Sequence, residues 1–367
     1  MLNDLRKKMV FITGPRQVGK TFLAKQVLKE FKNPVYLNYD NDEDRKIILQ
    51  RTWRLNTDVI IFDEIHKMKN WKMYLKGIYD GKPENQAILV TGSSRLDTFR
   101  QSGESLAGRY FHLRLNPLSV KELENMETSY NAIEKLNRLG AFPEPFLSGS
   151  EEEAARWRNQ YYTDLIREDI LDFSRIHEIK TMKLLLEMLR YRGGSPLSYS
   201  SLAGDLQISP NSVKKYIQIL ESLHIVFLLK PYYKQIGRSI RKEPKLYFYD
   251  TGFIKGDEGV KLENTTAVCL LKHIEYLIDV KGKNMSLNYL RTKDGKEIDF
   301  VISEDNEIRY LLEVKLSDSN LSKSLLSFGQ QFSQAESFQL VHNLRQEEYI
   351  KGINLGRAGD FLAKLDA

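Results

Sequence analysis

A glycine-bounded loop followed by Lys-Thr lies close to the start of the sequence and carries its clearest chemistry. It reads GPRQVGKT from Gly14 to Thr21 and matches the pattern G-x4-G-K-[ST]. Residues 10–13 before it form an apolar run typical of a buried strand, and residues 22–31 after it have the pattern of an amphipathic helix. Strand, loop and helix in this order are the context in which the pattern cradles phosphate groups.

This loop predicts a binding site for ATP, with Mg²⁺ as cofactor. Its glycines let backbone N–H groups turn toward phosphate oxygens, and the N-terminus of the following helix adds partial positive charge. We expect Lys20 to reach the β- and γ-phosphates and the Thr21 hydroxyl to bind Mg²⁺. The predicted nucleotide-binding residues are Gly14, Pro15, Arg16, Gln17, Val18, Gly19, Lys20, Thr21 and Phe22.

A second apolar run, residues 58–64, ends in two carboxylates, Asp63 and Glu64. An all-apolar strand is typical of a parallel sheet that is covered on both faces. In that setting Asp63 is predicted to hold Mg²⁺ and Glu64 to act as the general base on the attacking water. The alternative is a strand that ends in a solvated acidic turn.

Two further residues are candidates for sensing the γ-phosphate. Ser93 follows a third apolar run, residues 87–91, and Arg109 precedes the run YFHLRL. Arg109 is a candidate arginine finger, acting within its own chain or on a neighbouring subunit of a homo-oligomer. Each of the two could instead be an ordinary loop residue.

The order of these segments resembles a family of prokaryotic AAA-plus ATPases that carry a C-terminal domain of unknown function. The resemblance rests on GPRQVGKT, VIIFDEIHK, VTGSS, LAGRY and LNPLS, followed by YYTDLIREDI, SLAGDLQIS, KLYFYDTG and EIDFVI…LLEVK. It implies a P-loop NTPase domain in the N-terminal part. Family members usually have a helical stretch before the first strand. This chain begins almost on the strand, which leaves the adenine contacts unassigned.

Downstream, the sequence predicts a helix over residues 151–173 and then a helix-turn-helix. Residues 199–206 and 211–223 have helical patterns and flank a tight turn. Ser209 can cap the second helix, with Pro210 at its first position. Two strand-like runs around a basic loop follow, and together these elements predict a winged helix.

Positive charge is concentrated in this segment. Residues 195–245 contain eight basic and three acidic residues, a net +5 in a chain whose net charge is +6. If the basic side chains share a face, they predict phosphate contacts with DNA, and a winged helix used only for packing is the alternative. The predicted DNA-binding residues are Lys214, Lys215, Arg238, Arg241 and Lys242.

The last third contains a D-x(n)-E-x-K pattern in Asp299, Glu313 and Lys315. Strand alternation places Ile298 on one face with Phe300, and Asp299 on the opposite face. If the strands pair, the two carboxylates and the lysine converge. The pattern is similar to the PD-(D/E)xK nuclease core, which implies a second metal site, with Glu263 supporting it from a helix and Gln330 or Gln331 within reach. Half-exposed strands show the same alternation, so a structural role is the alternative.

Length and composition indicate a globular protein of two or three domains, without an apolar run long enough to span a membrane. The single cysteine, Cys269, excludes an internal disulfide and fits a cytoplasmic location. We expect an α/β chain with an AAA-plus-like parallel sheet at 1–120, a helical linker and winged helix at 121–255, and a restriction-endonuclease-like α/β domain at 256–367.

The predicted function is ATP hydrolysis coupled to DNA binding or remodelling. One alternative is an ATP-regulated, metal-dependent DNA endonuclease. The other is a nucleotide-dependent switch that binds a protein partner without nucleic acid.

Overall fold

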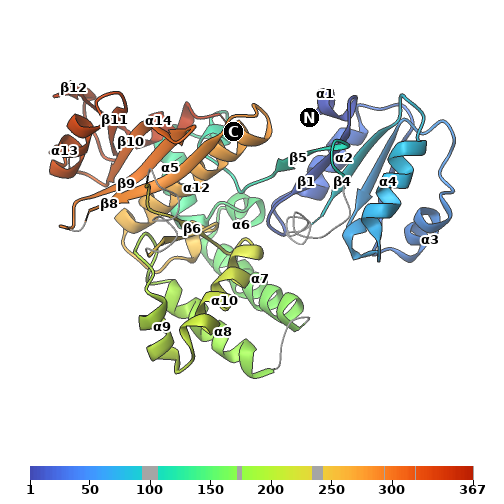
Figure 1. The fold of residues 1–367 in the computed structure, drawn as a ribbon, viewed down its shortest axis with the longest axis horizontal. Helices are drawn as coiled ribbons and strands as arrows, with labels where there is room; N and C mark the ends of the chain where they lie inside the picture. The colour runs from blue at the N-terminus through green and yellow to red at the C-terminus, as the bar shows by residue number, and fades with distance from the viewer. Residues whose placement is uncertain (93–105, 172–175, 234–242, 293, 319, 367) are drawn as a thin grey trace. The chain divides into compact units, whose positions relative to one another are not determined.

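A computed structural model describes residues 1–92, 106–171, 176–233, 243–292, 294–318 and 320–366 of the chain (Figure 1). The chain divides into two compact units, Met1–Asn116 and Pro117–Ala367. Among the described residues, no helix combines the length and apolar character that crossing a bilayer requires.

The first unit is a parallel five-stranded sheet with the strand order β2-β3-β4-β1-β5. Its central strands are completely buried because helices cover both faces. In chain order the elements are α1 (Leu2–Leu5), β1 (Met9–Thr13), α2 (Lys20–Leu28), β2 (Pro34–Asn38), α3 (Asp42–Gln50), β3 (Val59–Asp63), α4 (Trp71–Gly81), β4 (Ala87–Thr91) and β5 (Tyr110–Arg114).

Strand alternation divides the core of this unit into two layers. Val10 and Ile12 of β1 pack with Ala24 and Val27 of α2 on one face. Met9 and Phe11 point to the other face and pack against α4. A short helix, α1, precedes β1, which the sequence analysis did not predict.

The second unit begins with helices and a strand pair. Its first elements are α5 (Ser129–Leu139), α6 (Pro143–Ser148), α7 (Glu151–Leu171), α8 (Ile176–Leu189), α9 (Tyr199–Leu206), α10 (Pro210–Ser222), β6 (Val226–Leu229) and β7 (Lys245–Phe248). The predicted helix–turn–helix segment is present as α9 and α10, and β6 and β7 pair antiparallel. The Ser209 side chain accepts a hydrogen bond from Ser212 N at 3.0 Å, which caps α10 as expected.

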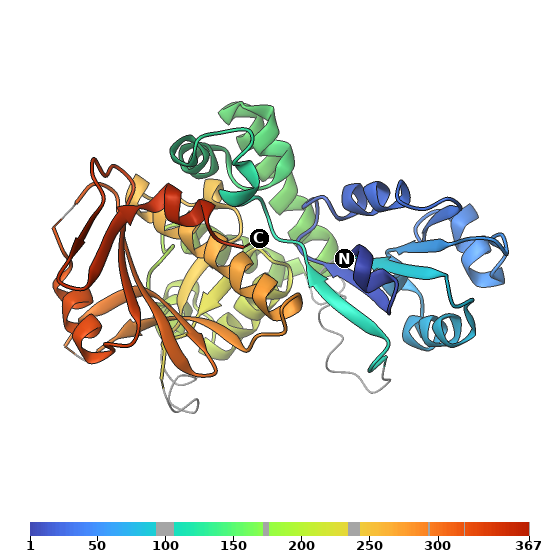
Figure 2. The ribbon, with the colours of Figure 1, turned by 90° about the horizontal axis from the view of Figure 1, so that it is seen from above.

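The rest of this unit is a mixed six-stranded sheet with the order β12-β13-β11-β10-β9-β8 (Figure 2). Its elements are α12 (Glu258–Asp279), β8 (Met285–Arg291), β9 (Glu297–Glu304), β10 (Glu307–Lys315), α13 (Lys323–Gln331), β11 (Glu336–Val341), β12 (Glu348–Ile350), β13 (Ile353–Arg357) and α14 (Ala358–Ala363). β8, β9 and β10 are antiparallel neighbours, whereas β10, β11 and β13 run parallel.

The expected alternation along β9 fails at its start. The register between β8 and β9 shifts by one residue between Asn288 and Leu290, as at a β-bulge. Ile298 therefore packs in the same apolar cluster as Val301 and Leu311, not with Phe300. The predicted shared face of Ile298 and Phe300 is wrong, because alternation assumes an uninterrupted ladder.

Candidate functional site

The loop between β1 and α2 has the backbone shape of an anion cradle. Gly14 and Gly19 have φ values of 142° and 104°, and Gln17 between them has a φ of 59°. Gly19 is the N-cap of α2, and a Cβ added there would meet nothing within 4 Å. The N-terminus of α2 therefore opens onto space in which its N–H groups can receive an anion.

Lys20 turns back toward this loop. Its side chain is buried, and Nζ donates hydrogen bonds to the carbonyl oxygens of Gly14 at 3.0 Å and Pro15 at 2.5 Å. Val18 is also buried and anchors the loop in the core, whereas Phe22 is 69% exposed on the first turn of α2. The ammonium group is thus held at the inner side of the loop, and Phe22 offers an aromatic face to solvent.

Asp63 lies at the carboxyl end of β3, and its carboxylate accepts hydrogen bonds from three hydroxyl groups. Thr21 Oγ1 donates to its Oδ2 at 3.0 Å, Tyr36 OH to the same oxygen at 2.5 Å, and Thr91 Oγ1 to Oδ1 at 2.7 Å. The sequence pattern predicted that Thr21 and Asp63 both bind Mg²⁺, and the structure places the two side chains in contact. The pattern did not identify Tyr36 or Thr91, which reach Asp63 from the neighbouring strands β2 and β4.

This donor set fits a magnesium–nucleotide complex. Mg²⁺ is commonly bound through one or two protein groups, with phosphate oxygens and water completing its octahedron. Thr21 supplies a hydroxyl and Asp63 a carboxylate beside the open N-terminus of α2. The residues present therefore suit the cofactor that the phosphate loop implies.

Glu64 follows directly and has the left-handed φ of 55°. Its carboxylate Oε2 lies 3.7 Å from Lys67 Nζ and 3.6 Å from His66 Nε2. Burial raises the pKa of Glu64 above its ordinary value, and the positive charge of Lys67 opposes that rise. A carboxylate with a raised pKa is a better proton acceptor, as a general base requires.

The two phosphate-sensing candidates have different outcomes. Ser93 lies outside the described residues. Arg109 lies at the start of β5, beside Met9, and forms a two-pronged ion pair with Asp80 at 2.8 and 3.1 Å. The phosphate loop leaves β1 at the opposite edge of the sheet, about 15 Å away along a five-residue strand. Nothing else in the described part of the chain places Arg109 relative to a bound nucleotide, so its role as an arginine finger, within its own chain or on a neighbouring subunit, stays a prediction.

The surface of α10 presents two of the predicted DNA-binding residues. Lys214 and Lys215 are exposed, while Val213 and Tyr216 on either side of them are buried. Arg238, Arg241 and Lys242 lie outside the described residues. Lys245, which contributes to the +5 charge of this segment, is only 2% exposed, so the charge available at the surface is smaller than the sequence count.

Lys245 instead lies among carboxylates at the carboxyl-terminal sheet. Its Nζ is 2.6 Å from Glu297, 3.2 Å from Glu263 and 3.6 Å from Asp299. Tyr247 OH donates to the same Glu263 oxygen at 2.7 Å. The ammonium group of Lys245 therefore lies within 3.6 Å of three carboxylates and balances part of their charge.

Glu313 adds a further carboxylate to this cluster, and Lys315 adds a second ammonium group. Asp299 accepts a hydrogen bond from Val314 N at 2.9 Å, and Glu313 pairs with Lys315 at 2.8 Å. Burial and the charge of Asp299 raise the pKa values of Glu263 and Glu313 to about 7. The structure brings the predicted residues together, but no group of three or more His, Cys, Asp or Glu side chains in the described parts of the chain could hold a metal ion.

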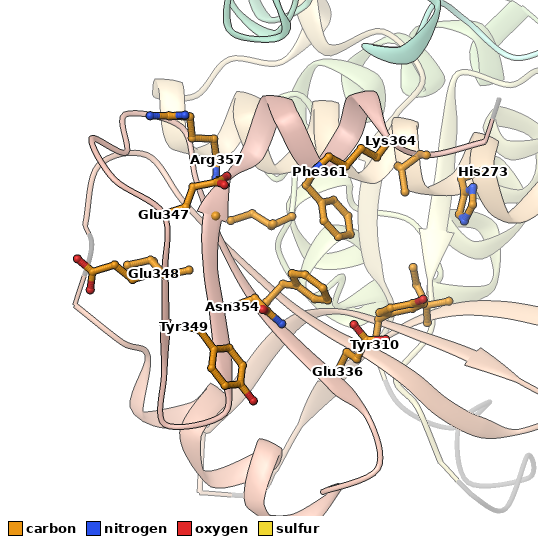
Figure 3. Close-up of a pocket in the computed structure, with 16 residues that line it drawn as sticks. His273, Tyr310, Glu336, Glu347, Glu348, Tyr349, Asn354, Arg357, Phe361 and Lys364 are labelled. Carbon is orange, nitrogen blue, oxygen red and sulfur yellow. The ribbon is translucent and has the colours of Figure 1, made fainter.

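A cavity of about 610 Å³ lies elsewhere on the carboxyl-terminal sheet, beside α14 (Figure 3). The ring centroid of Phe361 in α14 lies 5.0 Å from that of Phe338 at a tilted angle, and the Phe338 centroid lies 6.1 Å from that of Tyr310. Glu336 and Asn354 add polar groups to the same wall. Aromatic rings, carboxylates and an amide therefore line the same cavity, and no sequence motif indicated this combination.

Comparisons with known proteins divide the chain into three matched segments. Residues 6–124 match an AAA domain, residues 130–257 a domain of unknown function (DUF8612), and residues 258–355 another domain of unknown function (DUF4143). An uncharacterized protein of Mycobacterium tuberculosis is 27% identical over 88% of this chain and 74% of its own length. One of Methanocaldococcus jannaschii is 28% identical over 84% of this chain and 77% of its own.

Among solved structures, the Walker-type ATPase of Pyrococcus abyssi is similar at 15% identity and a TM-score of 0.43. The match covers 71% of this chain and 93% of that one. The matched segment, the parallel sheet and the phosphate loop together make the N-terminal part of this chain similar to AAA-like P-loop ATPase domains.

Proposed function

We propose that the protein binds and hydrolyses ATP and couples turnover to DNA binding or remodelling. One observation carries the ATP part. Thr21 at the N-terminus of α2 donates to Asp63 at the carboxyl end of β3, and the neighbouring Lys20 Nζ is held against the loop carbonyl of Gly14. In this proposal Lys20 binds phosphate oxygens and Glu64 takes the proton of the attacking water. Mg²⁺ would supply the charge that neutralises the phosphates, held through Thr21 and Asp63.

Two substitutions separate binding from chemistry. Lys20→Ala should abolish tight ATP binding, because Lys20 meets charge that is already present on the ground-state phosphates. Glu64→Gln should keep binding and stop turnover, because the base acts only in the chemical step. The measurements are nucleotide affinity and single-turnover hydrolysis. Hydrolysis by Glu64→Gln at the parental rate would remove Glu64 from the role of base.

For the DNA part, we infer that α9, α10, β6 and β7 form a winged helix whose exposed Lys214 and Lys215 contact phosphates. Replacing both with Ala should weaken binding to all DNA sequences and lower the salt slope of the affinity by about 2, if each neutralises one phosphate. Lys351→Ala, at an exposed turn, is the control. A gel shift with and without ATP tests this, and unchanged affinity and slope would favour a protein partner.

A titration of the ATPase rate against duplex, single-stranded and branched DNA tests the coupling itself. Stimulation by one form identifies the substrate class. If none of the three DNA forms changes the ATPase rate, ATP hydrolysis is not coupled to DNA. A nucleotide-dependent switch that binds a protein partner would then be the better proposal.

A metal-dependent endonuclease built on a nuclease-like carboxyl-terminal fold is the second candidate. The gathering of Glu263, Asp299 and Glu313 favours it, and Lys245 among them opposes it. Incubation of DNA with the protein and Mn²⁺ decides between them. Cleavage that Asp299→Ala abolishes would establish the nuclease, and intact DNA would leave the ATPase proposal alone.

We propose Arg109 as an arginine finger that acts within its own chain or on a neighbouring subunit, and mixing two inactive variants tests the second possibility. Mixing Arg109→Ala with Lys20→Ala protein should then restore part of the ATPase activity, since each supplies what the other lacks. A strictly monomeric protein with a concentration-independent rate would exclude that role. The single cysteine supports placing this activity in the cytoplasm.

A further inference from the structure

Asp63, the last residue of β3, accepts hydrogen bonds from several side chains. An ionised carboxylate has about four acceptor positions. Among the described residues, the hydroxyls of Thr21, Tyr36 and Thr91 occupy three of them. The carboxylate, which is 4% exposed, is thereby fixed in rotation with one position remaining.

Tyr36 is the least expected of these donors. Tyr36 lies in β2 and pairs with Ile61 of β3, two residues before Asp63. Its side chain is long enough to reach from there to the carboxylate of Asp63 at the end of β3. The ammonium of Lys25 from α2 lies 5.8 Å from the centre of its ring. The phenol is therefore positioned by the sheet below it and by the phosphate-loop helix beside it.

The direction of this hydrogen bond restricts what Tyr36 can do. An ionised carboxylate only accepts hydrogen bonds, so the Tyr36 hydroxyl is the donor in its 2.5 Å contact with Asp63 Oδ2. A group that donates to Asp63 in this way orients that carboxylate and leaves metal binding to the carboxylate itself.

We propose that Tyr36 is a positioning residue that fixes the Asp63 carboxylate for magnesium–nucleotide binding. The proposal rests on the ATP-binding function inferred above. Loss of the hydroxyl frees one acceptor position and lets the carboxylate rotate, because its terminal torsion is soft. Partners of this kind, which hold a metal-binding group in place, typically contribute about tenfold or more to metal affinity.

The test is nucleotide binding, which does not depend on turnover. The affinity of the full-length protein for fluorescent N-methylanthraniloyl-ADP is measured in EDTA and at increasing Mg²⁺ concentrations. Tyr36→Phe keeps the ring and removes only the hydroxyl. It should raise the half-saturating Mg²⁺ concentration about tenfold and leave the affinity in EDTA unchanged.

Tyr74→Phe is the matched control. The Tyr74 hydroxyl also makes a 2.5 Å hydrogen bond in the same unit, but to the carbonyl of Ile48 in place of Asp63. It should leave the Mg²⁺ dependence at the parental value, and the unfolding temperature of both variants in EDTA reports any general loss of structure.

A Mg²⁺ dependence of Tyr36→Phe equal to that of the parent or of Tyr74→Phe overturns the proposal. A tighter Mg²⁺ dependence also overturns it, because the hydroxyl would then compete with the metal for Asp63. If the parent itself binds no nucleotide at any Mg²⁺ concentration, the proposed ATP function fails and this role falls with it. That outcome is seen in the parent alone and is distinct from a failure of Tyr36.

Discussion

The pKa values of individual carboxylates in this protein depend on their immediate neighbours. Glu64 and Glu313 both have pKa values raised by burial, and each has a lysine that opposes the rise. The motif predicted Glu64 as the base, but its contact with Lys67 depends on the turn that follows it. That turn begins at Glu64 with a left-handed backbone, which a sequence pattern for a strand does not show.

The first prediction concerns the pH dependence of hydrolysis. A base must be ionised to accept a proton, so the rate should fall as pH drops through the raised pKa of Glu64. Lys67 lowers that pKa by its charge, so Lys67→Met should move the acid limb of the pH–rate profile to higher pH. Lys69→Met, which changes an exposed neighbour, should leave the limb in place. A limb that shifts equally in both variants contradicts the pairing.

The second prediction concerns stability. The pKa of Glu313 is about 7 in the folded protein and near 4.5 when unfolded, so the folded state binds the proton more tightly. Stability should therefore fall as pH rises from about 4.5 to about 7. Glu313→Gln carries no ionisable group and should remove part of that fall, on the order of 2 kcal/mol at pH 8.

Chemical denaturation at pH 5 and pH 8 measures this difference. The variant should gain stability relative to the parent at pH 8 and little at pH 5. A gain of the same size at both values would assign the effect to packing and not to the charge of Glu313.

Helices and strands could be predicted from the sequence where a single local signal, such as an apolar run or a capping residue, marked them. β1, β3 and β4 are continuous apolar runs in a doubly covered sheet, and α10 has both a capping serine and a proline at its start. β2 begins with Pro34, ends with Asn38 and lies half-exposed at the sheet edge, so no apolar run marks it. α12 begins at Glu258, where the Asp257 side chain accepts a hydrogen bond from Val260 N and caps the helix.

The third prediction concerns the junction of the phosphate loop with the sheet. A Cβ on Gly14 would lie 2.1 Å from the carbonyl oxygen of Leu115, and its φ of +142° disfavours other residues. Gly14→Ala should therefore lower the free energy of unfolding by more than about 2 kcal/mol. Gly19 also has a positive φ, but an added Cβ there would meet nothing within 4 Å. Gly19→Ala should therefore lower the free energy of unfolding only by the smaller cost of conformational strain. Thermal unfolding without nucleotide measures both, and equal losses would refute the clash.

At the scale of the whole molecule, each unit is held by contacts between segments far apart in the sequence. In the second unit, Arg158 of α7 forms a buried ion pair at 2.9 Å with Asp250, which follows β7. A Cβ on Gly140, at the end of α5, would lie 2.0 Å from Asp250, so only glycine fits there. The motif KLYFYDTG was visible in the sequence, but the partner of its aspartate was not, because ninety-two residues separate them.

The fourth prediction concerns this pair. Arg158→Met leaves the fully buried Asp250 without its counter-charge and should cost about 3–5 kcal/mol at neutral pH. The loss should shrink at low pH, because protonation removes the uncompensated charge. Arg138→Met, which breaks an exposed ion pair with Glu151 at 3.3 Å, should cost less than about 1 kcal/mol. Urea denaturation compares them, and similar losses would show that burial does not decide the energy.

The place of Lys245 among three carboxylates has a consequence for how this part of the protein responds to its surroundings. A counter-ion that belongs to the polypeptide cannot be diluted, exchanged or removed by a chelator. Its stoichiometry is fixed when the chain folds, whatever the supply of divalent ions. The charge balance around Lys245 therefore changes when Glu263, whose pKa burial raises to about 7, gains or loses a proton, and this part of the sheet responds to acidity where a metal-bridged sheet would respond to metal.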